Sequence, residues 1–414
     1  MTTDTINCNL FRVKDIGFLQ LGKMLDEKPK PSYSLKPYLK SKNIGWLNLK
    51  MDDVSEMFFN DNEMRSLKLK KGDLLFSEGG EVGKTAIWND ELQECYIQNS
   101  VHKLTVNKNI NPKYILYYSF LYGVLGYYNS IVNLVSIKHL TYEKLRRVCF
   151  IIPSLPEQQC MVDYLDKRLS AIDQRVEILE KQKYAYARLK KSIIHQAVTR
   201  GLNPDVRLKD SGIDWIGMIP EHWEVQRFKR IFTECKSVTK TGQEDLLSVS
   251  EYYGVARRID KMEDGEYESR ADSLVGYKVC MKDDLVINIM LAWKRGLGFS
   301  DYDGIVSPAY AVYRGKNIAS HYFHYLMRTD MYVAEYKRNS KGIIDSRLRM
   351  YTDRFNNIMA IVPPFDEQKA IANYLDEKCT RIDAAIENIS KQIDAFKRLK
   401  RALINEVITG KRAV

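Results

Sequence analysis

Two stretches of the chain carry apolar residues at a seven-residue period. In the first stretch the recurring positions are Leu165, Ile172, Leu179, Tyr186 and Ile193. In the second they are Leu375, Ile382, Ile389, Phe396 and Leu403. Good helix formers fill both stretches, and neither contains Gly or Pro after its opening prolines. The pattern predicts two helices with an apolar seam, each of about 42 residues and roughly 60 Å, ending near Gly201 and Gly410.

The two stretches belong to an internal repeat. Shifted by 210 residues, the segments that start at Ile151 and Ile361 align without a gap and are identical at about a third of their positions. The shared positions are Pro153/Pro363, Glu157-Gln158/Glu367-Gln368, Tyr164-Leu165-Asp166/Tyr374-Leu375-Asp376, Ile172-Asp173/Ile382-Asp383 and Arg188-Leu189-Lys190/Arg398-Leu399-Lys400. Two matched apolar seams predict that the helices pack on each other, on partner proteins, or on both in part.

The segments before the two helices also correspond, although more weakly. Residues 71–75 (KGDLL) match 282–286 (KDDLV), and residues 111–121 resemble 317–327. Short β-branched and aromatic runs, broken by Gly, Asn and Asp, predict strands in these segments. The chain is therefore expected to alternate: mixed domain, long helix, mixed domain, long helix.

Composition narrows the class of protein. The chain has 414 residues, 45% of them hydrophobic, and a net charge of +11, which favours a polyanionic partner such as nucleic acid. Its seven cysteines form no C-x-x-C pair, so no zinc or disulfide framework is expected, and a cytoplasmic location is predicted. An uncharged run lies between Lys113 and Lys138, but its many Tyr, Ser and Asn residues favour a helix inside a domain over a membrane span.

Several motifs together resemble the specificity subunits of type I restriction-modification systems. They are the paired P-x-x-E-Q…YLD…ID…RLK helices, the linker SGIDWIGMIPEHWEV at 211–225, and the segments EGGEVGKTAIW, YIQNSVHKL and NIMLAWKRGLGFSDYDGIVSPAYAVYR. The first domain departs from the family by lacking its own WIG-x-IPEHW segment.

The resemblance implies an α/β fold of two target-recognition domains separated by two long antiparallel coiled-coil helices, related by an internal pseudo-two-fold repeat. The expected boundaries are 1–152 and 202–362 for the recognition domains, and 153–201 and 363–414 for the helical spacers.

The resemblance also implies a non-catalytic protein without a cofactor. Such a subunit positions two methyltransferase subunits on double-stranded DNA, together with ATP-dependent restriction subunits in the full complex. Each recognition domain reads one half of a split, asymmetric target, while the helices set the spacing and dock the methyltransferases.

Catalytic alternatives rest on two short motifs. Gly83-Lys84-Thr85 resembles the end of a Walker A loop and leaves an NTPase open, but Glu78 stands where that loop needs its first glycine. A strand is predicted after Thr85 instead of a helix, which favours a hairpin tip near DNA. Val362-Pro363-Pro364-Phe365 resembles a methyltransferase motif, but valine cannot accept a hydrogen bond from a target amine, so this segment is read as a strand-to-helix junction. A coiled-coil scaffold without DNA binding is the remaining alternative.

The candidate DNA contacts are polar and aromatic residues near the expected hairpins. In the first domain they are Lys84, Gln98, Asn99, His102 and Lys103. In the second domain they are Asn288, Trp293, Lys294, Arg295, Ser307, Tyr310, Arg347 and Arg349.

Overall fold

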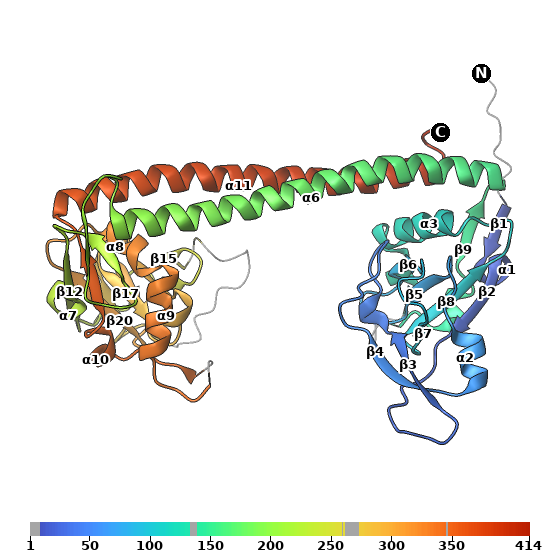
Figure 1. Cartoon of the computed structure of the whole chain (residues 1–414), viewed down its shortest axis with the longest axis horizontal. Coiled ribbons are helices and arrows are strands. Elements are labelled where there is room, and N and C mark those ends of the chain that lie inside the picture. Colours follow the sequence, from blue (N-terminus) through green and yellow to red (C-terminus); the bar gives the residue numbers. More distant parts are fainter. Residues whose placement is uncertain (1–8, 133–138, 259, 261–272, 345–346) are drawn as a thin grey trace. The chain divides into compact units, whose positions relative to one another are not determined.

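A computed structural model describes residues 9–132, 139–258, 260, 273–344 and 347–414 (Figure 1). The chain divides into two compact units, which are treated separately below. Unit 1 contains residues 1–180 and 391–414, and unit 2 contains residues 181–390. Two long helices, α6 (Leu155–Arg200) and α11 (Phe365–Ile408), each contribute one segment to each unit.

The long helices have 46 and 44 residues, slightly more than the sequence predicts. Gly201 and Gly410 follow their last turns with φ of +76° and +72°, a left-handed conformation that glycine adopts at low cost. Inside unit 1, Asp173 of α6 pairs with Lys400 of α11 at 2.7 Å. Inside unit 2, the repeat-related Asp383 and Lys190 pair at 2.6 Å. The helices therefore run antiparallel in both units, as predicted.

Each unit is built on a four-stranded antiparallel sheet with the same strand order. In unit 1 the order is β2 (Gly17–Leu21), β8 (Val101–Val106), β5 (Leu74–Ser77), β6 (Thr85–Ile87). In unit 2 it is β13 (Phe232–Cys235), β20 (Tyr310–Gly315), β17 (Leu285–Asn288), β18 (Leu297–Phe299). The internal repeat of the sequence is thus also a repeat of sheet topology.

Smaller strands surround these sheets. In unit 1 they are β1 (Asn9–Arg12) with β9 (Cys149–Ile152), and β3 (Ser34–Leu39) with β4 (Ser55–Phe59) and β7 (Tyr96–Ile97). In unit 2 they are β10 (Leu208–Asp210) with β11 (Met218–Pro220), β12 (Glu224–Arg227) with β21 (Met359–Val362), β14 (Leu247–Ser250) with β15 (Gly254–Arg257), and β16 (Lys278–Cys280) with β19 (Gly304–Val306).

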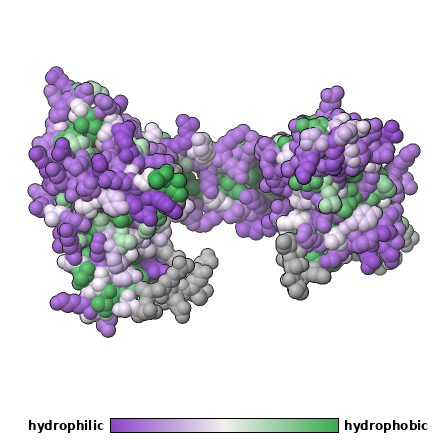
Figure 2. Space-filling view, turned by 90° about the horizontal axis from the view of Figure 1, so that it is seen from below, coloured by the Kyte–Doolittle hydropathy of each residue, from purple (hydrophilic) through white to green (hydrophobic). Residues whose placement is uncertain are grey.

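The shorter helices also occur in both units. Unit 1 has α1 (Val13–Ile16), η1 (Ser41–Asn43), α2 (Asp61–Leu67), α3 (Pro112–Val124), α4 (Tyr127–Ile131) and α5 (Tyr142–Leu145). Unit 2 has α7 (Phe228–Ile231), η3 (Ala292–Lys294), α8 (Ser320–Met327), α9 (Asp330–Asn339) and α10 (Thr352–Phe355). Side chains on the face of each unit in Figure 2 are mostly hydrophilic.

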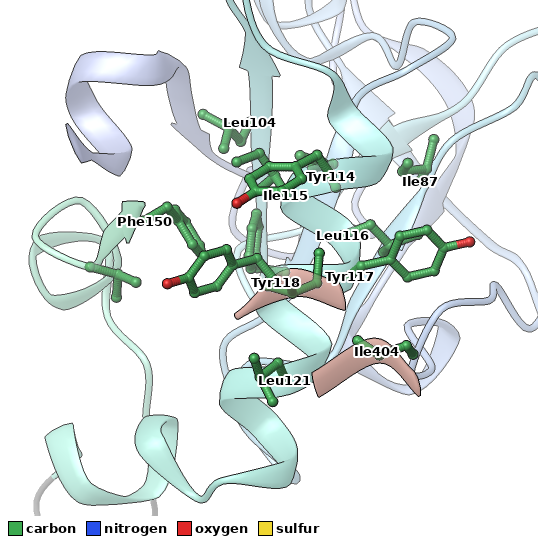
Figure 3. Packing of buried hydrophobic residues seen from close by; sticks show 14 of the residues in the cluster. Ile87, Leu104, Tyr114, Ile115, Leu116, Tyr117, Tyr118, Leu121, Phe150 and Ile404 are labelled. Atoms are coloured by element: carbon green, nitrogen blue, oxygen red, sulfur yellow. The ribbon is translucent and has the colours of Figure 1, made fainter. Parts of the chain in front are cut away.

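The uncharged, tyrosine-rich run forms α3 and α4 inside unit 1 as far as residue 132, and its last residues, from 133, lie outside the described part of the chain. Tyr114, Tyr118 and Leu121 of α3 pack with Phe150 of β9 and Ile404 of α11 (Figure 3). The Tyr114 hydroxyl donates to the carbonyl oxygen of Ile151 at 2.8 Å, which satisfies a polar group inside the core. Among the residues that the structure describes, no helix is long and apolar enough to cross a membrane.

The repeated Glu-Gln motif fastens each long helix to its own unit. Gln158 is fully buried, accepts a hydrogen bond from the Asn111 amide at 2.8 Å, and donates to the Pro153 carbonyl at 2.9 Å. In unit 2, Gln368 accepts from the Ala319 amide at 3.0 Å and donates to the Pro363 carbonyl at 2.8 Å. Val362-Pro363-Pro364-Phe365 is therefore a strand-to-helix junction, as predicted.

The two segments KGDLL and KDDLV each contain a buried aspartate that forms hydrogen bonds to a neighbouring strand. Asp73 and Asp284 are almost fully buried just before β5 and β17. Asp73 accepts from the Thr105 hydroxyl at 2.5 Å, and Asp284 accepts two hydrogen bonds from Arg314 at 2.8 Å each. Each aspartate thus ties its strand to the neighbouring central strand.

The linker with the WIG-x-IPEHW sequence connects both long helices within unit 2. Trp223 is fully buried, and its indole N–H donates to Glu367 in the first turn of α11 at 2.9 Å. A Cβ atom on Gly201 would lie only 3.2 Å from the Trp223 ring, so the ring also covers the end of α6. The linker therefore has a structural role in holding the two helix ends.

Candidate nucleic-acid interface

One edge of each four-stranded sheet gathers most of the predicted contact residues. In unit 1, β5 ends at Ser77 opposite Val101, the first residue of β8, and β6 starts at Thr85. Because the three strands are antiparallel, the end of β5 and the starts of β6 and β8 meet at the same edge. In unit 2 the equivalent edge lies where Asn288 faces Tyr310. We call these two places the recognition edges.

At the recognition edge of unit 1, Lys84, Gln98 and Asn99 precede strands β6 and β8. The Lys84 ammonium lies 2.7 Å from Glu81, which also accepts the indole N–H of Trp46 at 2.7 Å. These two hydrogen bonds lower the pKa of Glu81, the Lys84 contribution being the larger. Gln98 donates to Asn99 at 2.6 Å. All three predicted residues are partly exposed and available at this edge.

His102 and Lys103 lie further along β8 and are buried. The ring of His102 hydrogen-bonds to the carbonyl oxygen of Leu140 at 2.8 Å, and burial lowers its pKa to about 4. Lys103 donates to the carbonyl oxygens of Ser66 and Lys68 at 2.8 and 3.1 Å. The structure gives both side chains interior partners, so neither is included in the interface proposed below.

Gly83-Lys84-Thr85 lacks the surroundings of a phosphate-binding loop. Thr85 is fully buried, begins β6, and bonds through its hydroxyl to Ser119 at 2.5 Å. Gly83 has φ of +79°, and a Cβ atom there would lie 2.3 Å from the Tyr128 ring. A phosphate-binding loop is followed by a helix, whereas Thr85 begins a strand and its hydroxyl is bonded to Ser119, so the NTPase alternative is not supported.

At the recognition edge of unit 2, the loop between β17 and β18 presents Trp293, Lys294 and Arg295. The Trp293 indole donates to the Met290 carbonyl at 3.1 Å, which fixes the ring. The ammonium groups of Lys294 and Lys337 lie 5.0 and 5.3 Å from the ring centroid. Two cations over one indole give this loop a positive, flat surface suited to a polyanion.

Asn288, Ser307 and Tyr310 line the same edge. Asn288 is almost fully buried, and its side-chain oxygen accepts from the Met290 amide at 3.1 Å. Burial raises the pKa of Tyr310. Ser307 and Tyr310 are half-buried and adjoin a tight turn closed by the Tyr310 amide and the Ser307 carbonyl at 2.9 Å.

Arg347 and Arg349 lie in a separate segment that contacts the chain just after β17. Met350 donates its amide to the carbonyl oxygen of Ile289 at 2.8 Å, directly after β17. Arg349 is bridged to Lys341 by backbone hydrogen bonds of 3.0 and 2.9 Å. The segment therefore adds Lys341 to the two predicted arginines.

Sequence reasoning missed Lys337 and Lys341. Lys337 occupies the last turn of α9, whose contact with the β17–β18 loop has no local sequence signal. Its basic last turn, Lys337-Arg338, was the one available indication.

Among the described residues, no group of three or more His, Cys, Asp or Glu side chains is arranged to hold a metal ion.

Comparison with known proteins agrees with this architecture. Residues 6–185 match the family model described as "Type I restriction modification DNA specificity domain". The chain is 22% identical to the EcoBI specificity subunit of Escherichia coli, over 82% of this chain and 73% of that one. It is 23% identical to the MjaVIII specificity subunit of Methanocaldococcus jannaschii, over 94% of this chain and 88% of that one. The chain is thus similar to specificity subunits of type I restriction-modification systems over most of its length.

Solved structures of specificity subunits share the fold. A chain from a study of complex assembly and conformational transition in the type I R-M system aligns with a TM-score of 0.67 at 12% identity, covering 97% of both chains. The HsdS subunit from Thermoanaerobacter tengcongensis aligns with a TM-score of 0.50 at 14% identity, covering 99% of this chain and 98% of that one. The α/β fold with long helices, expected from the sequence, is thereby confirmed.

Proposed function

We propose that this specificity subunit reads a split DNA target, with one half-site for each unit. The observation that carries the proposal is the recognition edge, which occurs at the same place on the same sheet in both units. The two edges carry different side chains: Lys84, Gln98 and Asn99 in unit 1, and Asn288, Trp293, Lys294, Arg295, Ser307, Tyr310, Arg347 and Arg349 in unit 2. Similar frames with different side chains are suited to reading two different sequences.

The residue types at these edges match the groups that DNA presents. Arginine and lysine bind guanine edges or phosphates, and asparagine and glutamine bind adenine edges. Lys294, Lys337 and Lys341 are proposed to contact phosphates, because long flexible ammonium groups give charge without a fixed geometry. Residues 1–152 and 202–362 are proposed as the two recognition domains.

The long helices are proposed to dock two methyltransferase subunits, and the full complex to include ATP-dependent restriction subunits. The antiparallel helices offer the repeated Asp173–Lys400 and Asp383–Lys190 pairs, one in each unit. Equivalent surfaces on repeated segments are suited to two copies of one partner. The subunit is proposed to perform no chemical step and to need no cofactor of its own.

The test is a domain exchange in the complete methyltransferase. Residues 1–152 are replaced by the corresponding domain of another specificity subunit, and the methylated motif is determined by sequencing genomic DNA. The proposal predicts that one half of the motif changes and the other half is retained. A new motif in both halves, or an unchanged motif, would contradict the assignment of one half-site to each domain.

A further inference from the structure

The loop that carries Trp293 and Lys294 is held in place by a partly buried arginine. Arg328 follows the last residue of α8, and its guanidinium donates to three backbone carbonyls. These are Arg295 at 2.7 Å, Leu297 at 2.6 Å and Glu251 at 2.8 Å. The three acceptors belong to the β17–β18 loop, to β18, and to the turn before β15, so one side chain joins three segments.

The contact between the two arginines is reciprocal. Arg295 donates its Nε to the carbonyl oxygen of Arg328 at 3.0 Å and also pairs with Asp330. Arg295 has φ of +63°, a left-handed conformation that is unfavourable for a residue with a side chain. The strain persists because the surrounding hydrogen bonds fix the turn. This turn sets where Lys294 and Trp293 are displayed.

Partly burying the charged guanidinium of Arg328 costs free energy, which a purely structural role would not require. Burial lowers its pKa to about 10, and the hydrogen-bond partners of its guanidinium are neutral carbonyl groups. Replacing buried charged groups by apolar ones of similar volume often leaves a protein equally or more stable. The arginine fork offers something an apolar residue lacks, namely fixed directions for several carbonyl groups.

The corresponding loop of unit 1 is held differently. Glu81 accepts from Trp46 and pairs with Lys84, both at 2.7 Å, at the loop surface. Asn111 and Ala319 are structural counterparts, because their amides donate to Gln158 and Gln368. Counted from them, the counterpart of Arg328 is Phe120, whose ring packs edge-on against Trp46 at 5.8 Å. The two units thus share the loop, but different side-chain interactions hold it in place. Each set of interactions is therefore expected to affect only the half-site of its own unit.

We infer that Arg328 is a positioning residue for DNA specificity: it sets the β17–β18 loop so that unit 2 discriminates among half-site sequences, without itself contacting DNA. The inference rests on the proposed function, since it requires unit 2 to read a half-site. A displaced loop keeps its positive charge and therefore keeps phosphate affinity, while base contacts that need exact geometry weaken. Loss of Arg328 should therefore relax specificity more than it lowers affinity.

The experiment uses the complete methyltransferase and a DNA library randomised at every position of both half-sites. Methylated molecules are sequenced for the wild-type protein and for Arg328→Met, Arg328→Lys, Glu81→Gln and Arg338→Met. Arg338 is the matched control, because it is a mostly exposed arginine on α9 that pairs with Glu335 at 3.2 Å. The melting temperature of each variant is measured in parallel.

The expected result is a loss of about tenfold in discrimination at the unit 2 half-site for Arg328→Met, comparable to one good base contact. The unit 1 half-site should be unchanged, Arg328→Lys should restore part of the discrimination, and Arg338→Met should resemble wild type. Glu81→Gln should affect the unit 1 half-site alone. If Arg328→Met does not fold, Asp330→Asn provides the test. It removes the exposed negative charge that pairs with Arg295, and it should relax the same half-site more weakly.

Two results would overturn the inference. One is a folded Arg328→Met protein, or a folded Asp330→Asn protein in its place, with an unchanged sequence profile. The other is equal relaxation in both half-sites, which would indicate a general loss of structure. A wild-type protein whose library profile shows no split target would instead refute the proposed function, so the two failures are distinguishable.

Discussion

Replacing Gln158 by leucine should destabilise unit 1 without changing what the protein recognises. Gln158 is fully buried, and its amide forms three hydrogen bonds: with the Asn111 amide, and with the carbonyls of Pro153 and Asn109. Leucine has a similar volume, so little cavity is created. A net value of about 1 kcal/mol per hydrogen bond predicts a loss of roughly 3 kcal/mol.

Hydrogen–deuterium exchange of individual peptides is the suitable assay, because a protein of two units need not unfold in one step. A loss of roughly 3 kcal/mol should accelerate exchange in α3 and β9 by about a hundredfold where exchange requires opening of unit 1. Strands β17 and β20 of unit 2 should keep their rates. The exposed neighbour Gln159 provides the control, as Gln159→Leu should cost less than about 1 kcal/mol. Unchanged exchange in α3 of the Gln158→Leu protein would refute the reasoning.

Three further outcomes are expected. The stability contributed by neutral His102 is complete above its unfolded pKa of 6.5 and is lost as the pH falls towards its folded pKa of about 4. Acidification from pH 7 to pH 5 should therefore cost unit 1 about 2 kcal/mol in a denaturation experiment, and His102→Gln should remove this contribution. His324, whose pKa burial lowers to about 3, should leave a separate loss of stability in unit 2. Trp223→Ala should lower the unfolding free energy of unit 2 by about 3–5 kcal/mol in chemical denaturation, since the ring is fully buried against both helix ends. Lys84→Ala should weaken DNA binding and reduce the slope of the binding constant against salt concentration in a salt titration. It should leave the ATP hydrolysis of the isolated chain at background, and ATP hydrolysis that depends on Lys84 would contradict this account.

Local sequence patterns were sufficient for the long helices. The seven-residue period of Leu165, Ile172 and Leu179 needs only a helix and a partner seam, and all three side chains are buried. The repeat also aligned Gln158 with Gln368, and the two residues make equivalent hydrogen bonds in their own units. Patterns that depend on near neighbours or on an internal copy are visible in a single sequence.

The recognition edges were only partly predictable. Lys84 and Lys294 follow strands and lie in loops, so strand-and-turn reasoning reached them. Whether a polar residue on a strand faces solvent depends on which face of the sheet is covered, and the sequence does not show this. For that reason the burial of His102 and Lys103 was not predicted. Arg328, which follows α8, and Lys337 of α9 act across tertiary contacts with the β17–β18 loop, which a single sequence does not reveal.

The most direct test of the central claim is methylation mapping of genomic DNA from cells that express the cognate methyltransferase, with and without this chain. The account predicts a motif of two specific parts separated by unspecified bases, present only when the chain is present. A continuous motif, or a motif that persists when the chain is absent, would contradict the claim that this subunit selects the DNA target.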